Sequence, residues 1–265
     1  MRLTPKHLDE YTAQCRFGGQ SEATIKVKHR NLRIFVDYCA GAVLTTTLMA
    51  GWRAYIAERY TKAYSRINMV CKTNVFLDFL GLPELKIKSF DVERRKLHSK
   101  RDEGLTLDEL KQLLDYTEKV GKTGMNLLLH VLATTGIRSG EIAHITIEAV
   151  DIGFAEFVHH RNPRKVLLPD RLRTRLKEYA HAQGIRSGAI FVTRNGTPIH
   201  QRNIGSELKK IAAAVDIPKD KVNPTAFRIL FAKTYYEKYG DLSGLTDLLG
   251  VKDLNMSVLY IKEDA

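Results

Sequence analysis

Apolar residues recur at helical spacing along the first 90 residues. Between Ser21 and Ala40 one helical stripe is apolar and the opposite face is basic. The stripe consists of Ile25, Leu32, Phe35, Val36 and Cys39, and the basic face of Lys26, His29, Arg30 and Arg33. Further helical patterns cover 48–60 and 64–80, the second ending at Gly81 and Pro83 as helices commonly do. Residues 1–90 are therefore predicted to form a small all-helical bundle.

A second series of helical patterns begins near Gly104. Thr106 and Glu109 have the spacing of a capping box, which satisfies free backbone N–H groups at the start of a helix. Leu107, Leu110, Leu113 and Leu114 continue that helix. Other helices are predicted over 123–135, 170–182, 201–215, 224–239 and 241–249, with a short one that contains Arg138 and Glu141.

Extended segments interrupt this second series. Residues 150–160 and 165–168 have the composition of strands, and 161–164 has that of a turn between them. The predicted fold is mainly α, with one small antiparallel β-sheet in the second half. There is no internal repeat and no low-complexity tract.

The segment 86–101 has little apolar periodicity and carries seven Lys or Arg against two acids. It is predicted to be an exposed basic connector, although its composition equally fits a solvated run of charge. We therefore expect a helical domain over 1–90, a basic linker over 91–103 and a second domain over 104–265.

Composition adds a partner class to this outline. The 265 residues include 42 Lys and Arg against 30 Asp and Glu, a formal charge of +12, and 44% are hydrophobic. This is enough apolar material for two modest cores. A surface with this net charge favours the binding of a polyanion such as nucleic acid. If the basic residues were spread evenly over the surface, the charge would indicate no particular partner.

Cysteine and histidine usage indicates no cofactor and no metal. Cys15, Cys39 and Cys71 are odd in number and lack Cys-x-x-Cys spacing, so we expect reduced, mostly buried thiols. His159 and His160 lack further ligands at metal-binding spacing, and we expect them to contact DNA or to end a strand. There is no leader pattern, and apolar runs such as 125–133 are too short to span a bilayer, so a cytoplasmic or nucleoid location is expected.

Three segments carry the strongest chemical signal. Arg138 lies in ATTGIRSGEI (133–142), Arg228 in NPTAFRILFAKTYYE (223–237) and Tyr260 in LLGVKDLNMSVLY (248–260). Two guanidiniums can clamp one phosphodiester through forked hydrogen bonds, and a phenol can attack its phosphorus. In this order the segments resemble the phage-integrase and Xer-like family of tyrosine recombinases.

The resemblance assigns roles to these residues. It implies a site-specific DNA recombinase in which Arg138 and Arg228 hold the phosphate and Tyr260 forms a 3′-phosphotyrosyl link. Glu141 matches the acidic partner that holds the first arginine in place, and 1–90 matches the core-binding domain of the family. Energy of the broken bond is kept in the ester, so rejoining needs neither ATP nor an obligatory metal.

The chain departs from the family pattern at three positions. The family usually has histidine three residues before its second arginine and often just after it, where this chain has Thr225 and Ile229. After Leu-Leu-Gly, the usual histidine or tryptophan is replaced by Val251. Thr225 can still donate one hydrogen bond to a phosphate oxygen, but Ile229 and Val251 can donate none.

The departing 5′ oxygen needs a proton, which the family takes from a lysine in the hairpin turn. Counting back from Val166-Leu167-Leu168-Pro169 places that position on or near Arg161. Guanidinium is a poor general acid, whereas Lys165, the hairpin lysine, would have to reach inward from a shifted register. Alignment favours Arg161 and chemistry favours Lys165.

The implied partner is double-stranded DNA, bound by a homo-oligomer that is a tetramer at synapsis. Only Ile261–Ala265 follow Tyr260, too few for a stable helix of their own. Protomers are therefore expected to make weaker contacts, to use other surfaces or to exchange Tyr260 itself. The alternatives are a DNA-binding protein of the same fold with weakened catalysis, and a type IB topoisomerase-like enzyme.

Overall fold

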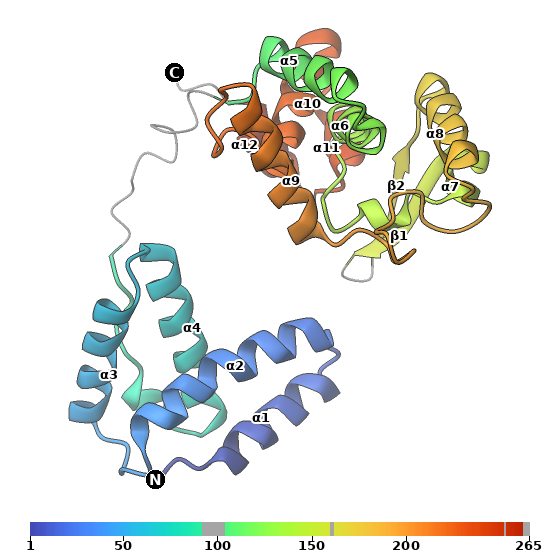
Figure 1. Cartoon of the computed structure of the whole chain (residues 1–265). Helices are drawn as coiled ribbons and strands as arrows, with labels where there is room; N and C mark the ends of the chain where they lie inside the picture. The colour runs from blue at the N-terminus through green and yellow to red at the C-terminus, as the bar shows by residue number, and fades with distance from the viewer. Residues whose placement is uncertain (92–103, 160–161, 252, 262–265) are drawn as a thin grey trace. The chain divides into compact units, whose positions relative to one another are not determined.

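The computed structural model describes residues 1–91, 104–159, 162–251 and 253–261. The chain divides into two compact units, Met1–Lys96 and Leu97–Ala265 (Figure 1). The division falls within the predicted basic connector, most of which lies outside the described residues. The boundaries drawn at 90 and 104 remain predictions.

The first unit is a bundle of four α-helices. They are α1 (Pro5–Phe17), α2 (Glu22–Cys39), α3 (Thr46–Arg59) and α4 (Ala63–Phe79), followed by the 3₁₀ helix η1 (Pro83–Leu85). Ser21 and Thr45 cap α2 and α3 by accepting backbone hydrogen bonds from Thr24 and Leu48. Helix α1 was not predicted, and it packs along α2 (Figure 1).

Aromatic side chains fill the core of the first unit. Phe35, Trp52 and Phe76 are fully buried, and the indole Nε1 of Trp52 donates a 3.1 Å hydrogen bond to Thr73 Oγ1. Cys15 and Cys39 are buried free thiols and Cys71 is exposed.

The first residues of the segment 86–101, which was predicted to be exposed, pack on the first unit. Ile87 is buried in the core of the first unit, and the Arg53 guanidinium lies 4.4 Å from the centre of the Phe90 ring. The backbone of Ile87 also exchanges two hydrogen bonds with the Asn74 side chain. These contacts fix the start of the segment on the first unit.

The second unit is mostly helical. Its elements are α5 (Leu107–Lys119), α6 (Thr123–Thr135), η2 (Ile142–His144), α7 (Ile147–Ile152), β1 (Phe154–His159), β2 (Asn162–Leu167), α8 (Asp170–Ala182), α9 (Gln201–Ala214), α10 (Pro224–Tyr239), α11 (Leu242–Leu249) and α12 (Leu254–Ile261). The predicted capping box is present, because the Thr106 backbone donates to Glu109 Oε2 and the Glu109 backbone to Thr106 Oγ1. A mostly helical fold with one small antiparallel sheet is confirmed.

Helix α6 lies at the centre of the core of this unit. Its residues Leu127, Leu128, Leu129, Val131 and Leu132 are all buried. Helix α10 packs against α6, and α11 and α12 pack against α10 and against each other. The helix that carries the second arginine therefore packs against the helix that precedes the first, and the two helices that follow it pack on α10.

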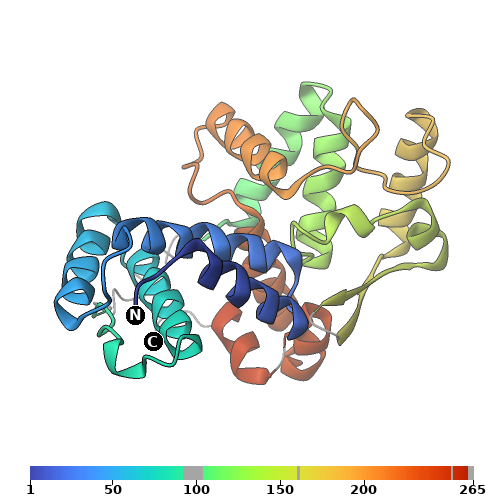
Figure 2. The same cartoon turned by 90° about the horizontal axis from the view of Figure 1, so that it is seen from below.

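Strands β1 and β2 form an antiparallel hairpin, which Figure 2 shows as a twisted ribbon. Glu156 is paired with Lys165 and Phe157 with Arg164. The first strand begins later than predicted, because Val150 belongs to α7, which ends at Gly153 with a positive φ of 91°. Arg164, predicted in the turn, is a residue of β2.

Two further elements differ from expectation. The predicted short helix around Arg138 and Glu141 is a loop and turn, because Gly136 adopts the left-handed conformation and ends α6. The 3₁₀ helix η2 starts only after Glu141. Tyr260 lies in the unpredicted helix α12.

In the described part of the chain, no helix combines the length and the apolar character that crossing a bilayer requires.

Candidate active site

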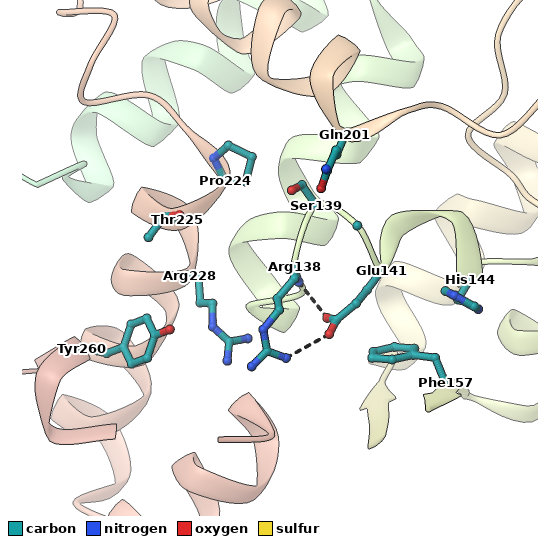
Figure 3. A pocket seen from close by; sticks show the side chains of 11 residues that line it. Arg138, Ser139, Glu141, His144, Phe157, Gln201, Pro224, Thr225, Arg228 and Tyr260 are labelled. Atoms are coloured by element: carbon teal, nitrogen blue, oxygen red, sulfur yellow. Dashed lines mark hydrogen bonds and ion pairs between the residues drawn. The ribbon is translucent and has the colours of Figure 1, made fainter. Parts of the chain in front are cut away.

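One pocket of the second unit brings the three predicted key residues together. It has a volume of about 500 Å³, and Arg138, Arg228 and Tyr260 all line it (Figure 3). The other lining residues are Ser139, Gly140, Glu141, His144, Phe157, Gln201, Pro224 and Thr225. Residues more than 120 positions apart in the sequence thus meet around one cavity.

Arg138 is held in place by Glu141. The carboxylate of Glu141 accepts 2.9 Å hydrogen bonds from the backbone N and from the Nη1 of Arg138. Glu141 is buried, whereas the Arg138 side chain is 30% exposed and its guanidinium faces the pocket (Figure 3). The predicted role of Glu141 as the partner of Arg138 is consistent with this pairing.

Arg228 is buried on the second turn of α10, with 3% of its surface exposed. Its Nη1 donates a 2.6 Å hydrogen bond to the carbonyl of Gly136, at the end of α6. Its Nη2 donates to the carbonyl of Leu249, at the end of α11. Burial, together with the charge of Arg138, lowers the pKa of Arg228 to about 10, so the group stays cationic at neutral pH.

Tyr260 reaches the pocket from α12. Its ring centre lies 5.3 Å from the Arg228 guanidinium carbon, and Figure 3 shows the phenolic oxygen directed toward the arginine. The ring packs on a small apolar cluster that includes Ala232, Leu245 and Leu249. A 2.8 Å hydrogen bond between the hydroxyls of Thr246 and Ser257 ties α12 to α11. Tyr260 therefore lies in the pocket of its own chain.

The three departures from the family pattern lie in different places. Thr225 lines the pocket on the first turn of α10, where the Asn223 side chain accepts a hydrogen bond from its backbone N. Val251 is half-buried in the same apolar cluster as Tyr260 and does not line the pocket. Ile229 is half-buried and also lies outside the lining.

Lys165 is not brought into the pocket. It lies on the exposed face of β2, with Nζ 4.0 Å from Glu156 Oε1 and 4.5 Å from the centre of the Phe154 ring. Side chains alternate along a strand, and Val166 and Leu168 take the buried face, so Lys165 faces outward. Its role as the proton donor stays a prediction, and Arg161 lies outside the described residues.

Strand β1 ends at His159, and the expectation that His159 and His160 contact DNA stays a prediction. His160 and the side chain of His159 lie outside the described residues. Among the side chains that the structure describes, no group of three His, Cys, Asp or Glu could hold a metal ion.

Sequence reasoning missed Arg164, which is 6% exposed and lies behind Glu141. Its Nη1 donates to Glu141 Oε2, and its Nη2 donates a 3.0 Å hydrogen bond to the carbonyl of Leu248. The signal for it was available, because Arg164 shares its strand face with the apolar Val166 and Leu168. His144 and Gln201, which also line the pocket, were missed because no motif marks them.

The site carries an excess of positive charge. Arg138 and Arg164 both pair with the carboxylate of Glu141, the one acidic side chain in the pocket lining, and Arg228 adds a further cation to that lining. The buried Nε atoms of Arg164 and Arg228 have no hydrogen-bond acceptor within the described protein. Buried donors normally have partners, so the free Nε of Arg228, together with the Arg138 guanidinium in the same pocket, favours an anion with several oxygens.

The fold is shared with a solved DNA recombinase. The chain aligns with lambda integrase, solved as a dimer bound to a COC′ core site, with a TM-score of 0.77 and 15% identity. The alignment covers 99% of this chain and 77% of that one. This fold and a pocket that joins an arginine pair to a tyrosine agree with the resemblance that the three sequence segments carry.

Sequence comparisons agree. A model of the phage integrase family matches residues 103–265, and the chain belongs to that family. It is 23% identical over 264 residues to tyrosine recombinase XerD of Halalkalibacterium halodurans, covering 91% of this chain and 87% of the relative. It is 24% identical over 286 residues to tyrosine recombinase XerC of Pseudomonas putida, covering 98% and 92%. The family predicted from the three segments is confirmed.

Proposed function

We propose that this chain cuts and rejoins DNA strands at specific sites, with Tyr260 as the nucleophile. The phenolic oxygen attacks a phosphodiester, forms a 3′-phosphotyrosyl bond and displaces the 5′ oxygen of the next nucleotide. A 5′-hydroxyl from another strand then attacks that bond, restores the phosphodiester and frees the tyrosine. The observation that carries this proposal is the meeting of Arg138, Arg228 and Tyr260 in one pocket.

The arginine pair is proposed to act on the transition state. Negative charge grows on the non-bridging oxygens as phosphorus becomes five-coordinate, and fixed cations lower the free energy of that state. Arg138 and Arg228 are both fixed by hydrogen bonds to the protein, so little reorganisation is needed when the charge develops. Thr225, on the pocket wall, is placed to donate a further hydrogen bond to a phosphate oxygen.

Protons must also move. The phenol of Tyr260 loses one as it attacks, and the departing 5′ oxygen gains one. The two predicted donors to that oxygen are Lys165, which faces away from the pocket, and Arg161, which lies outside the described residues. Neither assignment is tested.

The first unit is proposed to hold the DNA backbone. Lys28 and Arg30 lie near enough to Lys72 that their charges, together with burial, lower the pKa of Lys72, with burial as the larger cause. Clustered cations of this kind release counterions from DNA and make binding depend on salt. Double-stranded DNA is thus the proposed partner, bound by a tetramer when two sites exchange strands, in the cytoplasm near the nucleoid.

A nicked substrate that traps the covalent intermediate tests the nucleophile. The wild-type chain should give a protein–DNA adduct on a denaturing gel, and Tyr260→Phe should give none while binding DNA with unchanged affinity. Tyr239→Phe, at an exposed tyrosine of α10, is the matched control and should form the adduct normally.

Other outcomes would redirect the assignment. If Tyr260→Phe formed as much covalent adduct as the wild-type chain, Tyr260 would not be the nucleophile. An absence of adduct with every cognate site would leave a DNA-binding protein with weakened catalysis. Relaxation of supercoiled DNA without recombinant products would indicate a type IB topoisomerase-like enzyme.

A further inference from the structure

Three consecutive backbone carbonyls at the end of α11 are each bound by a different arginine. Arg164 Nη2 donates to Leu248 at 3.0 Å, Arg228 Nη2 to Leu249 at 2.5 Å and Arg138 Nη2 to Gly250 at 3.2 Å. This stretch leads directly to α12 and Tyr260. We call these three carbonyls the α11 terminus.

The physical reason for this arrangement lies in the end of a helix. The last carbonyls of a helix have no partner within it and carry the negative end of its dipole. Successive carbonyl oxygens are offset by about 100° around the helix axis while they all point toward its C-terminal end, so each oxygen can be reached by a donor from a different side of the axis. The α11 terminus therefore fixes where three guanidiniums sit relative to one another.

Arg164 differs from the other two arginines. It does not line the pocket, and it lies behind Glu141 in the buried layer beneath it. One end of its guanidinium binds the carboxylate that holds Arg138, and the other binds the segment that leads to Tyr260. It is thus the one of the three arginines that binds both Glu141 and this segment from outside the pocket lining.

Gly250 makes room for this contact. Its φ of 56° is left-handed, and a Cβ at this position would overlap the Cδ and Nε of Arg164. The chain therefore passes directly over the buried arginine as it leaves α11. The Leu-Leu-Gly segment that precedes the nucleophile is shaped to receive Arg164.

We propose that Arg164 is a positioning residue for DNA cleavage. It sets the place of Arg138 through Glu141 and the place of Tyr260 through the α11 terminus, without touching DNA. The inference rests on the proposed roles of Arg138 and Tyr260. A lysine cannot substitute, because a single ammonium lacks the planar fork that holds a carboxylate and a carbonyl at a fixed angle.

The test is single-turnover cleavage of a nicked site by Arg164→Lys and Arg164→Met. Each variant should bind DNA within about twofold of wild type but form the adduct about 10- to 100-fold more slowly, the range seen when a group that orients reactive groups is lost. Added guanidinium ion should restore part of the rate of Arg164→Met, and added ammonium should not.

Arg173→Met is the matched control. Arg173 makes the same kind of contact away from the pocket, donating to the carbonyls of Val150 and Asp151 and to the carboxylate of Asp170. Its loss should leave the cleavage rate near wild type. A thermal melt of each variant separates loss of fold from loss of positioning.

A double variant gives a second measure. If Arg164 acts partly through Arg138, then Arg138→Lys/Arg164→Lys should lose less rate than the product of the two single losses, because the support of Arg138 is already without effect while the support of the α11 terminus is still removed. Fully multiplicative losses would overturn the proposal.

The remaining outcomes are also decisive. Cleavage by Arg164→Lys within about threefold of wild type would overturn the proposal, as would a fall in DNA affinity that accounts for the fall in rate. If neither Arg164 variant folds, the residue is structural and the proposal fails. If the wild-type chain itself forms no adduct, the proposed nucleophile fails first.

Discussion

The two units differ in the charge of the polar side chains that they bury. Within residues 1–91 the buried polar side chains are Thr12 and Thr73, both uncharged. Each has a partner, since Thr12 donates to the Asp9 carbonyl at 2.9 Å and Thr73 accepts from Trp52. The second unit also buries uncharged polar side chains, but in addition it buries Glu141, Arg164 and Arg228, and two of the guanidinium N–H groups lack an acceptor in the described protein.

The first unit buries only polar groups that stabilise its packing, whereas the second unit buries charged groups that contribute little to its stability. A buried ion pair stabilises a fold weakly at best, because removing the charges from water costs about as much as their attraction returns. Departures from ideal burial are therefore expected at functional sites. Here the departure coincides with the pocket that holds Tyr260.

The largest expected effect concerns the packing of the first unit. Phe76→Ala should lower its free energy of unfolding by about 3–5 kcal/mol, because a fully buried ring is replaced by a cavity. Trp52, the one tryptophan of the chain, lies in the same core, so its fluorescence during urea unfolding reports on this unit. Val75→Ala, at an exposed neighbour, is the control, and an equal effect there would contradict the packing argument.

Next in size is the loss of either guanidinium from the pocket. Arg138→Lys or Arg228→Lys should slow adduct formation by about 10²- to 10³-fold, because the forked contacts to the phosphate are lost while the charge remains. Single-turnover cleavage of a nicked site measures the rate. Near-normal rates in both variants would mean that the pair does not clamp the phosphate.

A smaller effect on stability is expected from the loss of the buried hydrogen bond between Trp52 and Thr73 in the first unit. Thr73→Val should cost about 1–3 kcal/mol, since the Trp52 N–H loses its acceptor without a change of shape. Thr73→Ser keeps the hydroxyl and should recover most of that stability. Equal stability of the valine variant and wild type would show that the hydrogen bond contributes little.

The smallest effect is predicted for Lys165→Ala. The side chain faces away from the pocket, so the rate of adduct formation should fall by less than about tenfold, whereas loss of a general acid typically costs about 10²- to 10⁴-fold. A loss in that higher range would show that the hairpin rearranges on DNA and carries Lys165 inward. A substrate with sulfur in place of the 5′ oxygen would then restore the rate.

Sequence patterns predicted several of the longer helices closely. Helices α6, α8 and α10 have the predicted bounds, because residues that start or stop a helix mark their ends: Gly136 after α6, Pro169 before α8, and Asn223 and Gly240 on either side of α10. Helix α12 was missed, since its eight residues are apolar on most sides and show little periodicity. Helix α1, at the start of the chain, went unpredicted, and α7 was taken for part of a strand.

The site was predictable as far as local motifs extend. Arg138, Arg228, Glu141 and Tyr260 sit in recognisable segments, and the fold brings all four to one pocket. Arg164 was missed because composition placed it in a turn; once it is assigned to the strand, alternation with Val166 and Leu168 turns it inward and Lys165 outward. Contacts such as that from Arg164 to the Leu248 carbonyl depend on tertiary structure, which no local pattern records.

The packing of α12 on its own α10 and α11 has a consequence for mixed assemblies. With the proposed roles of Arg228 and Tyr260, each protomer would bring both its own clamp and its own nucleophile, and we expect that a defect in one chain is not complemented by a neighbour. A mixture of Tyr260→Phe and Arg228→Lys chains should form no more adduct than the two separately. Recovery of activity in the mixture would reveal that protomers lend each other the tyrosine.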